Sequence, residues 1–420
     1  MDLTLVDNGI KPAGTLGECA MTGDGSLKAI SPGRSFWERS FFSLRRLDRR
    51  LNVAAVADGK RAFVTLDGLR GLAAFAVLGR HTFPDFLFES YLAVDFFFVL
   101  SGFVLAHAYG QRLRAEMTTL DFMKVRLVRL YPLYALALVL SSVTVLTQFL
   151  HGHPPTLHTA IDYAAALLFL PSPASEGLFP LVGPSWSLFF ELVANAAFAL
   201  SWRRFGNRVL VAVVAMAAVI LIAAVPTRTL GFVHGAMDSG FYWSTFNAGL
   251  ARVGYSFFCG VLIYQMWSIR KSPINFPPVV IAAVLFAILA AHPSSNLQAV
   301  YDLCATIVVF PLIVWLAASS QVSGRLAHTF MVFGLASYGV YILQVSLMPV
   351  RSVIDKLNPG IGNTSPVAIG FVVFVFVFAI VTERYFDRPI RRRVMLWMRK
   401  SLPPPLPTVS QTRPSTLSNM

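Results

Sequence analysis

Two residues suited to proton and phosphate chemistry, His81 and Arg70, belong to one apolar run at residues 66–81. They are eleven positions apart, so on an α-helix they share one face, about 16 Å apart along the axis. An ionisable group inside a membrane costs at least a few kcal/mol and is by default a functional hypothesis. Because an imidazole titrates near neutral pH, we expect His81 to move a proton.

Three further charged residues, Asp95, Glu191 and Arg252, fall near the same predicted membrane boundary as His81. Charges inside a bilayer avoid lipid by facing one another or a wet cavity. We therefore expect all four side chains to converge on one site. The alternative is an ion pair of Arg252 with Asp95 or Glu191 that only tethers helices.

A second set of charges precedes the third predicted span, where Arg126 and Arg129 stand one helical turn apart. Two guanidinium groups at this spacing suit phosphate oxygens. Arg70 is expected at the same membrane face, which predicts a docking site for a phosphorylated cytosolic ligand. The alternative is that these arginines only mark a cytoplasmic loop.

The composition is that of a polytopic membrane protein. Hydrophobic residues make up 55% of the chain and charged residues 13%, against about 25% charged residues in soluble domains. The mean hydropathy is +0.63. The sequence predicts an all-α membrane bundle with about ten spans, at residues 66–83, 91–109, 131–150, 186–202, 208–226, 248–267, 277–291, 299–319, 329–349 and 366–383.

The basic residues predict the orientation, since short cytoplasmic loops are rich in Lys and Arg. Placing both termini in the cytoplasm puts all but six of the 35 Lys and Arg residues on that side or in its tails. The lipid bilayer then accounts for the net charge of +14 without a nucleic-acid partner.

We divide the chain into three parts. Residues 1–60 form a cytoplasmic tail, expected to be disordered apart from a possible amphipathic surface helix at 35–51. Residues 61–395 form the transmembrane domain, and residues 396–420 form a disordered, proline-containing cytoplasmic tail.

The order of motifs resembles the acyltransferase 3 family of integral membrane proteins. The likeness covers about residues 60–395 and includes the spacing of Arg70 and His81. The family often has histidine where this chain has Gln344. The matching segments are LDGLRG (66–71), VDFFFVLSGF (94–103), RLVRLYP (126–132), WSLFFE (186–191), GLASYGVYILQ (334–344) and ERYFDRP (383–389).

The resemblance implies an enzyme of the bacterial inner membrane that moves an acyl group, often acetyl, from cytosolic acyl-CoA to an extracytoplasmic glycan or similar acceptor. It implies that His81 is the general base, or alternatively carries an acyl-histidine intermediate, and that Asp95 or Glu191 orients it. The CoA phosphates would be held by Arg70, Arg126 and Arg129, and no metal is expected. A proton-coupled transporter or flippase of a glycan or lipid is the alternative function.

Overall fold

The computed structural model describes residues 19–21, 27–29, 63–83, 86–152, 154–202, 206–232, 236–270, 275–357 and 364–400. Its contacts divide the chain into two units, Met1–Ala62 and Phe63–Met420. In the first unit, β1 (Cys19–Met21) and β2 (Leu27–Ala29) form an antiparallel pair. Apart from these two strands, the tail at residues 1–60 that we expect to be disordered, including the possible helix at 35–51, lies outside the described residues, as do residues 401–420.

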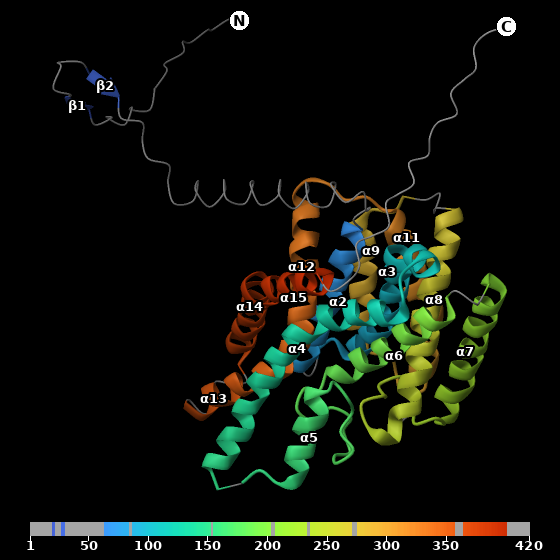
Figure 1. Cartoon of the computed structure of the whole chain (residues 1–420), viewed down its shortest axis with the longest axis horizontal. Coiled ribbons are helices and arrows are strands. Elements are labelled where there is room, and N and C mark those ends of the chain that lie inside the picture. Colours follow the sequence, from blue (N-terminus) through green and yellow to red (C-terminus); the bar gives the residue numbers. More distant parts are fainter. Residues whose placement is uncertain are drawn as a thin grey trace, which may run out of the picture. The chain divides into compact units, whose positions relative to one another are not determined.

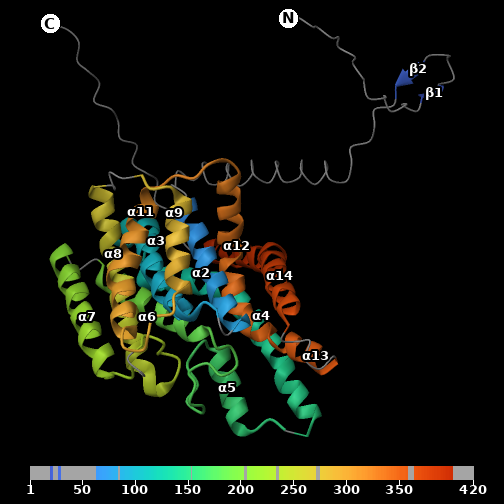
Figure 2. The same cartoon turned by 180° about the vertical axis from the view of Figure 1, so that it is seen from behind.

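The second unit is a bundle of helices (Figures 1 and 2). In the order of the chain, its elements are α2 (Val64–Thr82), η1 (Phe88–Leu92), α3 (Ala93–Ala115), α4 (Thr119–Leu150), α5 (Leu157–Leu167), α6 (Ser185–Ser201), α7 (Asn207–Thr227), η2 (Trp243–Thr245), α8 (Phe246–Ile269), α9 (Pro278–Ala290), α10 (Gln298–Cys304), η3 (Ala305–Val309), α11 (Phe310–Ser319), α12 (Gly324–Leu347), α13 (Pro349–Leu357), α14 (Ser365–Thr382), η4 (Glu383–Asp387) and α15 (Arg388–Lys400).

Membrane-length helices dominate this unit. Within the part of the chain that the structure describes, seven helical segments are long and apolar enough to cross a membrane. The helices α6 and α9 are apolar but shorter. Every predicted span overlaps a helix, while the exact number of spans and the orientation of the termini remain predictions. The last helix, α15, extends to Lys400, beyond the predicted start of the C-terminal tail at residue 396.

Two pairs of helices approach closely through glycines. In α3 and α8 the contact is reciprocal: a Cβ on Gly102 would lie 1.9 Å from the Phe257 oxygen, and one on Gly260 would lie 1.9 Å from the Val99 oxygen. In α2 and α12, a Cβ on Gly71 would lie 2.5 Å from the backbone of α12. Small residues let backbones approach in membrane bundles. These two pairs hold Arg70, His81, Asp95 and Arg252.

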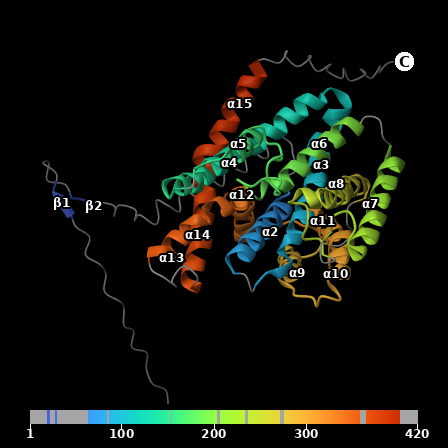
Figure 3. The ribbon, with the colours of Figure 1, turned by 90° about the horizontal axis from the view of Figure 1, so that it is seen from below.

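The helix α4 differs from the prediction. It starts at Thr119, capped by Thr118, whose hydroxyl accepts from the amide of Asp121. Arg126 and Arg129 therefore lie inside a helix that continues through Pro132, and not in a loop before the third span. Figures 1 and 3 show α4 crossing the bundle obliquely, with α15 beside its first part.

Leu87, just before η1, has an unusual backbone conformation and packs against the end of α2. Leu87 has φ of 62°, a left-handed conformation that is rare for a bulky residue. Its side chain packs where a Cβ on Gly79 would be, 2.3 Å away. This packing fixes the end of α2, which bears Arg80 and His81.

Candidate functional site

A cavity of about 580 Å³ opens at the end of α2 and is lined by His81. Its wall also includes Trp186, Arg252, Tyr341 and Gln344. These residues come from α6, α8 and α12. We call this region the histidine end of the bundle. The structure thus brings His81 and Arg252 to one cavity, as the sequence predicted.

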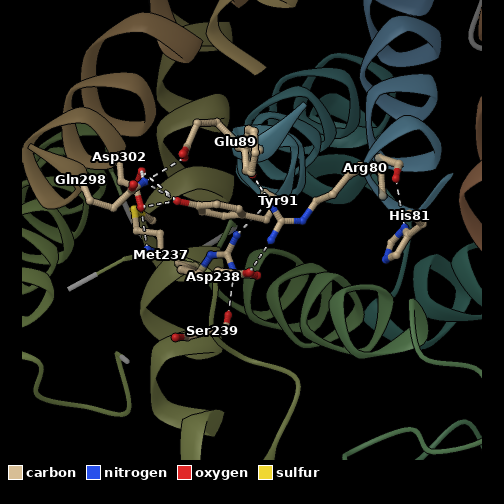
Figure 4. Close-up of polar contacts among 12 residues, drawn as sticks. Arg80, His81, Glu89, Tyr91, Met237, Asp238, Ser239, Gln298 and Asp302 are labelled. Atoms are coloured by element: carbon tan, nitrogen blue, oxygen red, sulfur yellow. Dashed lines mark hydrogen bonds and ion pairs between the residues drawn. The ribbon is translucent and has the colours of Figure 1, made fainter. Parts of the chain in front are cut away.

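The hydrogen bond of His81 defines its tautomer. Its Nδ1 lies 3.0 Å from the carbonyl oxygen of Val77, one turn earlier on α2. A carbonyl only accepts, so Nδ1 must carry the proton and Nε2 of the neutral ring keeps its lone pair. The imidazole is exposed and lines the cavity (Figure 4). In the neutral ring, Nε2 is therefore the nitrogen that can accept a proton.

Asp95 and Arg252 form a buried ion pair in the α3–α8 crossing. Arg252 Nη2 lies 2.7 Å from Asp95 Oδ2, and the two side chains are 1% and 0% exposed. Arg252 also donates to the carbonyl oxygens of Ser239, at 2.6 Å, and of Tyr91, at 3.2 Å. Of the two ion pairs considered from the sequence, the structure has this one. Asp95 holds Arg252 in the cavity wall, and within the described residues its side chain is hydrogen-bonded to Arg252 and Ser256 and not to His81.

Glu191 lies elsewhere than predicted. Its Oε1 accepts from Arg126 at 2.7 Å and from the Ser101 hydroxyl at 2.6 Å, and it is not among the residues that line the cavity. The reason is the early start and oblique course of α4, which carry Arg126 to the side of α6. The predicted convergence of Glu191 with His81 and Arg252 is therefore not found.

Arg70 and Arg129 flank one turn of α12. Arg70 donates to Ser337 Oγ at 2.9 Å and to the Gly334 oxygen at 3.2 Å. The Arg129 guanidinium lies 5.5 Å from the centre of the Tyr338 ring. We call the region of Arg70, Arg126 and Arg129 the arginine end of the bundle.

Each arginine of this end is already ion-paired. Arg70 contacts Asp67 at 2.9 Å, and Arg129 contacts Asp387 at 3.5 Å. Both arginine side chains keep about a third of their surface exposed, 32% and 35%, whereas Arg126 keeps 13%. Partly exposed pairs of this kind are weak. The acid paired with Arg70, Asp67, is 46% exposed, whereas the acid paired with Arg129, Asp387, is 0% exposed. An anion could therefore replace the carboxylate most readily at Arg70.

Gln344 occupies the position at which the resembling family often has histidine. It is fully buried on α12, and its Nε2 donates to the Tyr341 oxygen at 3.2 Å. Its Oε1 is buried without a hydrogen-bond partner among the described residues. Since Gln344 lines the same cavity as His81, this oxygen is available to accept a hydrogen bond there.

Sequence reasoning missed a polar network beside the cavity. Tyr91 donates to Asp302, and Arg80 pairs with Asp238 at 3.0 Å. Asp302 is the single acid in the predicted span at 299–319. That isolation was the available signal, because an intramembrane carboxylate needs a partner. Asp238, by contrast, stands in a loop that no pattern singles out.

Comparisons with known proteins agree with this architecture. The family model described as an acyltransferase domain matches residues 63–384. "Protein 2 in picA locus" of Rhizobium radiobacter is 44% identical over 179 residues, which cover 39% of this chain and 94% of the relative. No solved structure matches the chain significantly.

Two longer alignments involve proteins whose names state a role. The exopolysaccharide production protein ExoZ of Rhizobium meliloti is 26% identical over 308 residues, covering 71% of this chain and 89% of ExoZ. The peptidoglycan O-acetyltransferase OatA of Listeria monocytogenes is 24% identical over 376 residues, covering 78% of this chain and 56% of OatA. The family match extends over most of the chain, from α2 into η4. The chain therefore belongs to the acyltransferase 3 family of multi-pass membrane O-acyltransferases.

Proposed function

We propose that this protein transfers an acyl group, in the simplest case acetyl, from cytosolic acyl-CoA to a hydroxyl of an extracytoplasmic glycan at the bacterial inner membrane. The family membership and the names of ExoZ and OatA, which refer to an exopolysaccharide and to peptidoglycan, support a glycan acceptor. The observation that carries the proposal is the geometry of His81, which lines a cavity and whose Nδ1 donates to the Val77 carbonyl, so that Nε2 of the neutral ring keeps its lone pair.

In the proposed reaction, His81 Nε2 takes the proton of an acceptor hydroxyl as the oxygen attacks the thioester carbonyl. A C–O bond forms, and the carbonyl π electrons move to the oxygen. When the tetrahedral intermediate collapses, the C–S bond breaks and the imidazolium returns the proton to the CoA sulfur. The products are the O-acyl ester and free CoA, and His81 regains its starting form.

The donor is assigned to the arginine end. Arg70 and Arg129 are the accessible cations there, and guanidinium groups form strong bonds with phosphate oxygens. From Arg70 to His81 the α2 axis rises about 16 Å, a distance that an extended pantetheine arm can cover. The thioester would then reach the cavity while the nucleotide stays at the other end.

The two acids receive positioning roles in this proposal. Asp95 holds Arg252, whose guanidinium forms part of the cavity wall, and Glu191 holds Arg126. Neither acid needs to ionise or donate a proton during the reaction. His81 is thus the one catalytic residue that we assign.

The test uses purified protein in liposomes with radiolabelled acetyl-CoA, together with analysis of O-acetyl groups on glycans of whole cells. We expect wild-type protein to release CoA and to form an acetyl ester, and the His81→Ala variant to do neither. Glycan export without consumption of acetyl-CoA would contradict the proposal and favour the transport alternative. A covalent acetyl-protein adduct lost with His81 would replace the base mechanism by the acyl-histidine one.

A further inference from the structure

A second cavity, of about 540 Å³, adjoins the one that contains His81. Both cavities are lined by Arg80, Tyr91, Asp238 and Phe241. His81 lines only the first. A molecule in the second cavity would therefore lie next to the reaction centre without occupying it.

Arg80 forms the boundary between the two cavities. Its guanidinium pairs with Asp238 at 3.0 Å, donates to the carbonyl of Phe88 and lies 5.2 Å from the centre of the Tyr91 ring. Figure 4 shows Arg80 extending from the end of α2 toward Tyr91 and Asp238, while His81 lies apart from this network. The charge of Arg80 is thus neutralised by Asp238 at the boundary.

Two buried carboxylates, those of Glu89 and Asp302, are hydrogen-bonded to Gln298 at one side of the second cavity. Gln298 Nε2 lies 2.9 Å from Glu89 Oε2 and 3.0 Å from Asp302 Oδ1 (Figure 4). The Met237 amide also donates to Asp302, at 2.7 Å. Glu89 and Asp302 are 3% and 0% exposed. Within the described ranges neither carboxylate has an ion pair, and of the two only Glu89 lines the second cavity.

Rings form the other walls. Phe88 and His292 lie with their centroids 4.0 Å apart, and Phe241 and Tyr242 lie 4.6 Å apart. All four line the second cavity. Small-molecule sites commonly combine aromatic walls with a few placed polar groups. A pyranose ring suits both surfaces, because its C–H faces are apolar and its hydroxyls donate to carboxylates.

We propose that this second cavity is the acceptor subsite and that it binds an uncharged pyranose in preference to a uronic acid. The inference rests on the proposed function. The wall includes the carboxylate of Glu89, which has no ion pair within the described ranges, and the single arginine in the wall is already paired with Asp238. A carboxylate on the sugar would meet like charge, which is how a binding site excludes a close analogue. A hydroxyl at the edge of the ring would reach the cavity of His81.

The experiment compares methyl β-D-glucopyranoside with methyl β-D-glucopyranosiduronate as acceptors for purified protein in nanodiscs. Hydrolysis and transfer of radiolabelled acetyl-CoA are measured separately. We expect kcat/KM for the glucoside to exceed that for the glucuronide by about tenfold or more. Glu89→Gln keeps the hydrogen bond with Gln298 and removes the charge, so it should reduce this ratio through better use of the glucuronide.

A steric variant tests the location. Ser295 lines the second cavity, and its neighbour Ser294 does not. Ser295→Trp should lower the ratio of transfer to hydrolysis about tenfold, whereas the matched control Ser294→Trp should leave it at the wild-type value.

The results separate this inference from the proposed function. No consumption of acetyl-CoA by wild-type protein would overturn both. Hydrolysis without transfer to either glycoside, equal use of the two glycosides, or equal behaviour of the Ser295→Trp and Ser294→Trp variants would overturn the inference alone.

Discussion

The two ends of the bundle treat charge differently. At the histidine end, Asp95 and Arg252 are almost fully buried against each other. At the arginine end, Arg70 and Arg129 keep about a third of their surface exposed, 32% and 35%, while paired with acids. A buried pair is fixed, because separating it leaves a charge in a low-dielectric interior. An exposed pair exchanges partners at little cost.

This difference assigns separate tasks to the two ends. The buried pair shapes the cavity wall and leaves His81 as the titratable group free for chemistry there. The exposed arginines suit a ligand that arrives and departs, such as the phosphates of a donor. A substitution that weakens one end should leave the other end unchanged.

The largest effect is expected from His81→Ala. Without the base, kcat for acetyl transfer should fall about 10²–10⁴-fold, with little change in stability, because His81 is exposed and its Nδ1 bonds to Val77 on the same helix. The matched control is His158→Ala on α5, whose imidazole is exposed and bonded to the Ala174 oxygen. If the activity of His81→Ala were within threefold of the control, His81 would not be the catalytic base and the reaction would not take place at the histidine end.

Next in size is the loss of the buried pair. Asp95→Leu should lower the free energy of unfolding by about 3–5 kcal/mol, because Arg252 is left buried and unpaired, and the double variant with Arg252→Met should recover most of it. Unfolding in mixed micelles with increasing denaturing detergent measures this. The comparison at the other end is Asp67→Asn, which should cost about 0–1 kcal/mol. Equal losses for Asp95→Leu and Asp67→Asn would refute the contrast between the ends.

A smaller loss of stability is expected at the α3–α8 crossing that holds the pair. Gly260→Ala places a methyl group within 1.9 Å of the Val99 oxygen and should cost about 1–3 kcal/mol through overpacking. Gly254→Ala, on the same helix with open space around its Cβ, is the control and should be neutral or slightly stabilising. The same unfolding assay compares the two. If Gly260→Ala lowered the free energy of unfolding no more than the control, the close approach of α3 and α8 would not be needed for stability.

The smallest effect is expected at the arginine end. Arg70→Gln should raise the KM for acetyl-CoA about tenfold through the loss of one charged phosphate contact, with kcat nearly unchanged. The KM for acetyl-pantetheine, which has no nucleotide, should stay at its wild-type value. A parallel rise for both donors would mean that Arg70 acts through the fold and not through phosphate.

The sequence predicted the membrane class and the helices well, since long apolar segments leave little choice of structure. It also predicted that His81 and Arg252 share one site, because charged side chains at the same membrane depth avoid lipid by facing one another or a wet cavity. Glu191 was misplaced, since its position depends on where α4 starts and how it tilts, which tertiary packing decides. The network of Glu89, Tyr91 and Asp302 joins segments more than 200 positions apart, and such pairing leaves no local pattern.

We expect binding of the CoA donor and acyl transfer to belong to different ends of the bundle. This separation is tested most directly by calorimetric titration of CoA into wild-type and His81→Ala protein, with acetyl transfer measured on the same preparations. We expect the same Kd for CoA in both proteins and transfer only by the wild type. Loss of CoA binding in the His81→Ala variant, or transfer that survives the substitution, would contradict it.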